Sequence, residues 1–506
     1  MVRQIQTRRD FLKAVSWGAA ALAVQGCAET SRRFAGRSSD YPNIIFIMAD
    51  DMGYGDVTCY NPDSLTPTPN MDRIAADGIR FTDAHSPSSL CSPTRYGVLT
   101  GRYGWRTRLK RGALVGFNPP LIEPGRTTVA KFLKWHGYET ACIGKWHVGF
   151  NWQVKPGEKV DFWKPLDWPV DYITEVSKKI DYSKPITEGP TTHGFDYFFG
   201  TAGCPTCDPP YCFIENDRTV GIPSVMPGED VPGDPGLMVP GWKHQDVDTV
   251  FVDKAVEFIK QHKSKRPSEP FFLYLPLSAP HEPHLPPDFI KGKSSEGPRG
   301  DMVAWVDWSV GQILDTLDKM NLTDNTLLIV TSDNGPLQGE KGHKSAGDFR
   351  GFKASIWEGG HRVPFIARWP GKIKPASTSN EVICLTDLMA TCGAIVQTPI
   401  PPDAGEDSYN ILPALLGEKL DKPLRQATVH HSGGGVFAVR RGKFKVIFET
   451  PGSGIERPQP LSEGQLYDME KDPYEKRNLW GRHTDVIQSL SDLLLEYIRL
   501  GRSRPL

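Results

Sequence analysis

Four short apolar runs, each ending in charged or polar residues, constrain the fold more than any other feature of the sequence. Their sequences are NIIFIMAD (43–50), ETACIGKWH (139–147), PFFLYLPLSAPH (270–281) and NTLLIVTSDNG (325–335). A strand that is apolar at consecutive positions is buried on both faces, as strands in the middle of a parallel sheet are. The runs therefore predict buried parallel strands whose polar ends meet at one edge of the sheet.

Segments with helical spacing lie between these runs. Residues 70–78 and 127–137 each end in glycine, a common helix stop, and residues 303–320 form a longer helical pattern. Strands that alternate with helices predict an α/β fold, in which helices cover both faces of a large, mostly parallel sheet. We expect this main domain to span residues 40–400.

The chain changes character after about residue 400. Three short β-like runs, QATVHH, GVFAVRR and KFKVIFE, precede LYDMEKDPYEKRNL and a final helical segment, TDVIQSLSDLLLEYIR. This order predicts a smaller C-terminal α+β subdomain over residues 401–506. Residues 151–190 and 204–245 are rich in Trp, Pro and Gly without a sustained period, as in long loops that line a binding site.

The N-terminus has the features of an export signal. TRRDFLK (7–13) contains a twin arginine, and the apolar run that follows it, residues 14–24, is shorter than the roughly 20 residues that span a bilayer. We predict a twin-arginine signal peptide over residues 1–27 and a periplasmic or cell-surface location. Gln25-Gly26-Cys27 resembles a lipoprotein cleavage site, so a lipid anchor on Cys27 stays open, whereas no membrane span is expected.

The overall charge excludes some classes of partner. The 506 residues are 24% charged and carry a formal net charge of −1, so no global field favours nucleic acid or an anionic membrane. We therefore expect no nucleic-acid partner. An anionic substrate would have to be held by a local cluster of cations.

Oxygen ligands stand at the ends of the first and last apolar runs. Asp50 and Asp51 close the first run, and Asp333 and Asn334 close the last. Three carboxylates and an amide oxygen are hard ligands, which suit Ca²⁺ or Mg²⁺ better than a softer transition metal.

Basic side chains end the two other runs. Lys145 and His147 end the second, and His281 ends the third. Each of these residues alone could have an ordinary structural role, such as a histidine hydrogen-bonded to backbone. Together they predict a site, because ligands of open α/β sheets bind beyond the carboxyl ends of the strands.

The motifs around these residues resemble those of a known family. CSPTRYGVLTGR (91–102) resembles the signature of the type I sulfatases, in the alkaline phosphatase superfamily, and GKWHVG (144–149) resembles their second signature. Other blocks of the family follow in the same order: ADDMGYGD (49–56), SAPHEPH (278–284), SDNG (332–335), FKASIWEGGHRVP (352–364) and LYDMEKDPYEKRNL (466–479). The resemblance covers nearly the whole mature chain and implies an alkaline phosphatase-like fold and an arylsulfatase-like enzyme.

The resemblance implies that Cys91 is modified. In this family a separate maturation enzyme oxidises the cysteine of C-x-P-x-R to formylglycine (3-oxoalanine), an aldehyde. A hydrated aldehyde carries two hydroxyls on one carbon, so one attacks sulfur and the other later expels sulfate as the carbonyl re-forms. A serine or cysteine would instead be left as a stable sulfated side chain.

The remaining roles also follow from the resemblance. Asp50, Asp51, Asp333 and Asn334, with the modified Cys91, would hold one Ca²⁺, with Mg²⁺ the less expected ion. The expected roles of the other residues are as follows: Arg95 fixes the gem-diol, Lys145 and Lys353 clamp the sulfate, His147 acts as a base, His281 protonates the leaving alcohol, His284 contacts substrate, and Glu358 and Arg362 order the loop of Lys353.

The substrate and two rival functions stay open at this stage. Trp152, Trp163, Trp168 and Trp242, in the irregular segments, either stack on sugar rings of an oligosaccharide sulfate ester or anchor long loops. A small-molecule aryl sulfate is the other substrate class. The rival functions are a phosphate- or phosphonate-ester hydrolase of the same superfamily and a catalytically inactive carbohydrate-binding relative.

Three cysteines in one irregular segment have two interpretations. Cys204, Cys207 and Cys212 include a C-x2-C pair, which is half of a zinc motif. No second pair with metal-ligand spacing follows, so a loop with one disulfide or with free thiols is the favoured interpretation.

Overall fold

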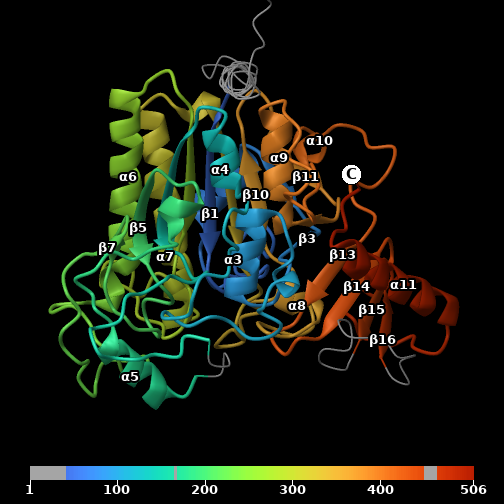
Figure 1. Cartoon of the computed structure of the whole chain (residues 1–506). Coiled ribbons are helices and arrows are strands. Elements are labelled where there is room, and N and C mark those ends of the chain that lie inside the picture. The colour runs from blue at the N-terminus through green and yellow to red at the C-terminus, as the bar shows by residue number, and fades with distance from the viewer. Residues whose placement is uncertain (1–40, 164–167, 449–463, 506) are drawn as a thin grey trace, which may run out of the picture.

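A ten-stranded mixed sheet forms the centre of the molecule (Figure 1). The computed structural model describes residues 41–163, 168–448 and 464–505, so the expected signal peptide and Cys27 lie outside the described residues. The strand order is β11-β2-β10-β9-β1-β8-β4-β5-β6-β7. The bounds of these strands are β1 Asn43–Ala49, β2 Ile79–Phe81, β4 Glu139–Lys145, β5 Tyr197–Thr201, β6 Ile214–Glu215, β7 Arg218–Thr219, β8 Phe271–Pro276, β9 Thr326–Ser332, β10 Phe365–Arg368 and β11 Ser377–Ser379.

The four predicted apolar runs are the central strands of this sheet. Strand β1 pairs in parallel with β8 on one side and β9 on the other, and β4 pairs in parallel with β8. Every residue of β1, β8 and β9 is buried. Because successive side chains point to opposite faces, Ile44 and Phe46 enter one core and Ile45 and Ile47 enter another. The consecutive apolar pattern is thus the signature of a strand with a core on each face.

Helices cover both faces of the sheet, which confirms the predicted fold class (Figure 1). Helices α2, α6 and α7 pack on the face that holds Ile45, and α3, α4 and α9 pack on the other face. Their bounds are α2 Pro69–Ala76, α3 Cys91–Thr100, α4 Val129–Lys134, α6 Val247–Lys265, α7 Pro298–Lys319 and α9 Leu388–Ile395. The segment expected to be irregular over residues 151–190 contains one further amphipathic helix, α5 (Val170–Lys179).

A four-stranded antiparallel sheet and the last helix form the smaller C-terminal unit beside the main sheet (Figure 1). These elements are β13 Thr428–His431, β14 Phe437–Arg441, β15 Phe444–Phe448, β16 Gln465–Asp468 and α11 Thr484–Leu500. Ile411 and Leu415, which follow residue 401, pack in the core of the large sheet. The remaining short elements are β3 Ala84–His85, β12 Ile383–Cys384, α8 Glu358–His361 and α10 Leu412–Leu415. Within the described ranges, no helix is both long and apolar enough to cross a membrane.

Candidate active site

Strands β1 and β9 bring four oxygen-bearing side chains to one edge of the large sheet. Asp50 and Asp51 follow β1 directly, and Asp51 has the left-handed backbone conformation (φ +69°) that turns the chain at this point. The backbone N–H of Asp333 donates to Ala49 at 3.0 Å, so the residues after β9 continue beside those after β1. Asn334 then donates from Nδ2 to Oδ1 of Asp51 at 2.7 Å. The parallel register of the two strands therefore assembles this acidic cluster.

Cys91 lies against these carboxylates. It is the first residue of α3 and its side chain is buried, with 3% of the residue exposed. Its Sγ and one carboxylate oxygen each of Asp50 and Asp333 lie within 4.8 Å of one another. The N-terminus of a helix presents free backbone N–H groups and a positive dipole end, so an anion formed at this position is stabilised.

Arg95, one turn further along α3, ties the cysteine helix to the sheet edge. Its guanidinium donates to Oδ2 of Asp333 at 2.8 Å and to the carbonyl of Lys145 at 2.9 Å. It also lies 3.4 Å from Oδ2 of Asp50. Burial alone would lower the pKa of this arginine, but the carboxylates of Asp333 and Asp50 outweigh burial and raise it. Arg95 is therefore a fixed cation at the bottom of the site.

Two lysines supply further positive charge. The Nζ of Lys145, the last residue of β4, lies 2.5 Å from Oδ2 of Asp50. The Nζ of Lys353 lies 2.6 Å from Oδ2 of Asp51. Burial would lower the pKa of each lysine, but in each case the adjacent carboxylate dominates and raises it. Both lysines are thus charged at neutral pH. Lys145 reaches the cluster from the end of β4, and Lys353 reaches it from the loop before α8.

Two buried oxygen atoms at the cluster have no hydrogen-bond partner among the described residues. They are Oδ1 of Asp50 and Oδ1 of Asn334. A buried polar atom without a partner is costly, and hard oxygen donors are the ligands that Ca²⁺ and Mg²⁺ prefer. The donor set therefore fits a divalent cation of this type.

Two histidines flank the cluster in different protonation environments. His147 donates from Nε2 to the carbonyl of Leu114 at 2.6 Å, and burial lowers its pKa to about 3, so Nδ1 is an unprotonated acceptor. His281 donates from Nδ1 to the carbonyl of Glu282 at 2.5 Å, and its Nε2 lies 3.8 Å from Asp51. Burial would lower the pKa of His281, but the negative charges of an ionised Cys204 thiolate and of the Asp51 carboxylate raise it to about 10. One histidine can accept a proton and the other can donate one.

The site geometry agrees with comparisons with known proteins. The family model described as Sulfatase matches residues 42–397, which contain every residue of the cluster. The chain belongs to the sulfatase family. The sulfatase is also 34% identical to an N-acetylgalactosamine-6-O-sulfatase of Bacteroides thetaiotaomicron, with 93% of this chain and 95% of the relative covered. Human arylsulfatase A is 33% identical, with 90% and 87% covered. The chain is therefore a sulfuric ester hydrolase.

Solved structures agree with this assignment. A Bacteroides thetaiotaomicron protein described in connection with the metabolism of multiple glycosaminoglycans superposes with a TM-score of 0.77 at 32% identity, covering 91% of the sulfatase and 99% of that chain. A sulfatase from Pseudoalteromonas sp. superposes with a TM-score of 0.69 at 23% identity, covering 98% and 95%. At 23% identity, the similarity to the Pseudoalteromonas protein supports the fold only.

The predicted supporting residues lie around the sulfatase site. Arg362 and Glu358 form an ion pair of 2.6 Å in the turn that follows Lys353, as expected for residues that order this loop. His284 is half-buried, and burial followed by the charge of Arg299 lowers its pKa. Its Nε2 is buried and has no hydrogen-bond partner among the described residues.

The sequence analysis did not assign Cys204 to the sulfatase site. The structure places its buried Sγ 3.4 Å from Nδ1 of His281. The three cysteines of this loop, Cys204, Cys207 and Cys212, are free thiols, which is one of the two arrangements that the sequence analysis favoured. The Sγ atoms of Cys204 and Cys207 and one ring nitrogen of His281 lie within 4.8 Å of one another. One sequence feature could have placed Cys204 at the site. The C-x2-C pair directly follows β5, which pairs in parallel with β4, so the pair lies at the same edge of the sheet as Lys145.

Asp208, in the same loop, was also missed. Its Oδ2 accepts from the backbone N–H of Cys204 at 3.0 Å and lies 3.7 Å from Nε2 of His147. Burial raises the pKa of this carboxyl. The loop after β5 therefore contributes side chains beside both histidines of the site.

Most of the tryptophans anchor loops. Trp152 and Trp168 are buried, and Trp152 donates from Nε1 to the carbonyl of Gly116 at 3.0 Å. Trp242 is half-buried, packs on Phe213 with 4.8 Å between ring centroids, and donates from Nε1 to a neighbouring histidine. Trp163 is 69% exposed, so it alone of the four presents most of its surface to solvent.

Proposed function

We propose that this sulfatase removes a sulfate ester group from a carbohydrate, with a formylglycine made from Cys91 as nucleophile and one Ca²⁺ as cofactor. The observation that carries the proposal is the position of Cys91, buried at a helix N-terminus within 4.8 Å of Asp50 and Asp333. Two relatives that carry the name N-acetylgalactosamine-6-sulfatase, one bacterial and one human, support a sulfated sugar as substrate.

Fixed cations would bind the sulfate group. Lys145 and Lys353 approach the cluster from β4 and from the loop before α8, and each carries its charge at neutral pH. Their carboxylate partners, Asp50 and Asp51, are also proposed cation ligands, so the lysines would exchange these partners for sulfate oxygens. Cations held in place before the reaction stabilise charge developing at sulfur without further reorganisation.

In the first step, one hydroxyl of the hydrated formylglycine attacks sulfur. An S–O bond forms to that hydroxyl oxygen, which releases its proton to solvent. The S–O bond to the sugar breaks, and the sugar oxygen takes a proton as it leaves. His281 is the proposed donor of this proton, because its Nδ1 is held by the carbonyl of Glu282 while its Nε2 lies at the edge of the cluster, 3.8 Å from Asp51. The product is a sulfate hemiacetal on residue 91.

In the second step, the remaining hydroxyl of residue 91 loses its proton and the carbonyl re-forms. The C–O bond to the sulfate group breaks, and water then hydrates the aldehyde again. His147 is the proposed acceptor of the proton, since its lowered pKa and its unpartnered Nδ1 leave a lone pair available. The net reaction consumes one water and yields an alcohol and sulfate.

A cation would be held by Asp50, Asp51, Asp333 and Asn334. The unpartnered oxygens of Asp50 and Asn334 support this assignment, and their hardness favours Ca²⁺. When bound, such a cation lowers the pKa of a coordinated hydroxyl and offsets negative charge. Arg95 lies below the same cluster, where it would orient residue 91.

The remaining parts of the proposal concern maturation and location. Oxidation of Cys91 requires a separate maturation enzyme, which would act before the helix N-terminus is buried. The twin-arginine motif supports export to the periplasm or cell surface after folding, and Cys27 is the proposed attachment point if the protein is lipid-anchored.

The decisive experiment is a mass measurement on the peptide that contains residue 91, taken from active enzyme. Conversion of Cys91 exchanges sulfur and two hydrogens for one oxygen, and hydration adds one water. The same preparation is assayed against sulfated mono- and oligosaccharides, with Cys91→Ala as the inactive control. An unmodified thiol in fully active enzyme would contradict the mechanism, and activity confined to aryl sulfates would contradict the carbohydrate assignment.

A further inference from the structure

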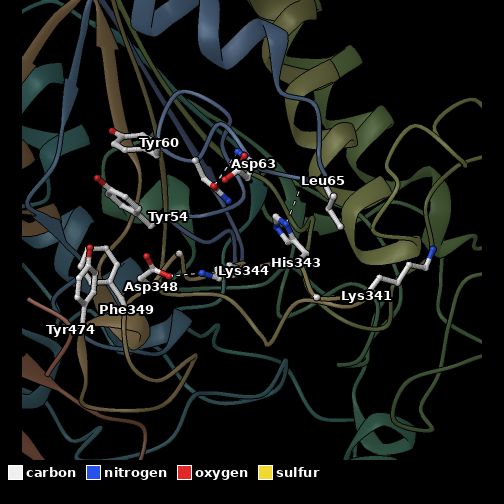
Figure 2. A pocket seen from close by; sticks show the side chains of 13 residues that line it. Tyr54, Tyr60, Asp63, Leu65, Lys341, His343, Lys344, Asp348, Phe349 and Tyr474 are labelled. Atoms are coloured by element: carbon white, nitrogen blue, oxygen red, sulfur yellow. Dashed lines mark hydrogen bonds and ion pairs between the residues drawn. The ribbon is translucent and has the colours of Figure 1, made fainter. Parts of the chain in front are cut away.

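A second cavity lies in the loops that follow the acidic cluster. It has a volume of about 560 Å³ and is formed by residues 54–65, by residues 341–349 and by Tyr474 of the C-terminal unit (Figure 2). Its volume lies within the range of small-molecule binding sites, about 300–1,000 Å³. None of the site residues described above lines it.

Four aromatic rings form one wall of this cavity. Figure 2 shows Tyr60, Tyr54, Phe349 and Tyr474 in a row, and their successive ring centroids are 4.5, 5.2 and 5.7 Å apart. Arg362 lies 5.0 Å from the centre of the Phe349 ring, and Tyr60 donates to the carbonyl of Phe365 at 2.7 Å. Contacts with the body of the protein therefore hold the wall in place.

Hydrogen-bonding groups face this wall across the cavity. Lys344 pairs with Asp348 at 2.7 Å, and Asp63 is exposed at the rim. Lys341 donates to the carbonyl of Ser295 at 3.3 Å and points away from the aromatic wall (Figure 2). The side chains of Tyr54 and Tyr474 line the cavity. Sugar hydroxyls both donate and accept, so a site with ammonium, carboxylate and phenol groups beside aromatic rings fits a sugar unit.

The cavity is connected to the active site through the chain. Tyr54 follows Asp51 by three residues, and Phe349 precedes Lys353 by four. The loops that carry a proposed cation ligand and a proposed sulfate clamp are thus the loops that form the cavity walls. Three residues of extended chain span at most about 11 Å, so Tyr54 lies within the length of an oligosaccharide from Asp51.

We propose that this cavity is a remote subsite for one sugar unit of an oligosaccharide whose sulfated unit occupies the active site. The inference rests on the proposed carbohydrate substrate, and it adds that the enzyme prefers oligosaccharides to single sugars. The sugar ring packs against the wall of Tyr54 and Tyr474, and its hydroxyls bond to Lys344 and Asp63.

The test compares two substrates, 6-O-sulfated N-acetylgalactosamine and a tetrasaccharide that ends in the same unit. In the double variant Tyr474→Ala, Lys344→Ala, the ratio of kcat/KM for the tetrasaccharide to that for the monosaccharide falls about tenfold, through a higher KM for the tetrasaccharide. The control is Trp135→Ala, which removes an exposed aromatic at the end of α4, outside the cavity. An unchanged ratio overturns the subsite.

A binding measurement separates this inference from the proposed function. Calorimetric titration of the tetrasaccharide into Cys91→Ala protein needs no turnover, and adding the two cavity substitutions weakens binding about tenfold. If the cavity substitutions weaken tetrasaccharide binding but the wild type releases no sulfate from the tetrasaccharide, the proposed function is overturned and the subsite is kept. Equal tetrasaccharide affinity with and without the cavity substitutions overturns the subsite even if the wild type is active.

Discussion

Lys445 of β15 donates to Glu358, with 3.0 Å between Nζ and Oε1. The same ammonium lies 2.8 Å from Oε1 of Glu475, and all three side chains are fully buried. Glu358 begins α8, five residues after Lys353. A buried cation of the C-terminal unit therefore joins Arg362 in holding the turn that carries a proposed sulfate clamp.

Replacing this cation is expected to cost both stability and substrate binding. In Lys445→Met, Glu358 keeps Arg362, but Glu475 stays buried without a counter-ion, which typically costs about 3–5 kcal/mol of the free energy of unfolding. Urea denaturation measures this cost, and KM for a sulfate ester is expected to rise. Lys443→Met, two residues away and exposed, is the matched control. Equal stability of the two variants would contradict the structural role of Lys445.

Acid is expected to destabilise the protein through three buried histidines. Burial lowers the pKa of His85 to about 4 and those of His361 and His430 well below the ordinary value. The unfolded chain takes up protons below about pH 6.5 while the folded chain does not, so the free energy of unfolding falls as pH decreases from 6.5 toward 4. Each histidine contributes up to about 1.4 kcal/mol per pH unit in that window.

Urea denaturation at pH 7.5 and pH 5.5 measures this loss. In His430→Leu one of the three buried histidines is removed, so the difference in stability between the two pH values is expected to shrink. His483→Leu, at the start of α11, is the control and keeps the wild-type difference. A pH dependence that is the same in both variants would rule out the buried histidine as a source.

Removal of the divalent cation is expected to lower thermal stability. A ligand that binds only the folded state adds about 2.7 kcal/mol at a concentration of one hundred times its Kd. After chelation, the unfolding temperature of the wild type should rise again with Ca²⁺, and by less with Mg²⁺. Asp333→Asn should lose this response, whereas Asp324→Asn, exposed at the other end of β9, should keep it. Stabilisation of the Asp333 variant by Ca²⁺ would refute the ligand assignment.

Replacement of His281 is expected to affect substrates according to their leaving group. An alcohol of a sugar needs a proton as it leaves, whereas a nitrophenolate needs little assistance. In His281→Ala, kcat for a sugar sulfate should therefore fall by far more than kcat for nitrophenyl sulfate. His284→Ala is the matched comparison, and its effect should not depend on the leaving group. Equal losses in His281→Ala on both substrates would exclude general-acid catalysis by this residue.

The sequence pattern was sufficient for four strands of the main sheet, β1, β4, β8 and β9, and for the residues that follow them. Strands that are apolar on both faces have an unambiguous pattern, and their polar last residues, such as Asp50 and Lys145, must meet at the carboxyl edge because parallel strands share a direction. Helix α5 was missed because its apolar residues occupy one narrow stripe between segments rich in proline.

The sequence by itself determined four strands of the central sheet, the residues at their ends, and the motif that makes Cys91 a candidate for oxidation. Only the tertiary structure decided that Cys204 lies beside His281, that Lys445 supports Glu358, and that Tyr474 completes a cavity with Tyr54. The physical reason is distance along the chain. Local patterns report which face of a strand or helix is buried, whereas contacts between loops and subdomains depend on packing that no single segment encodes.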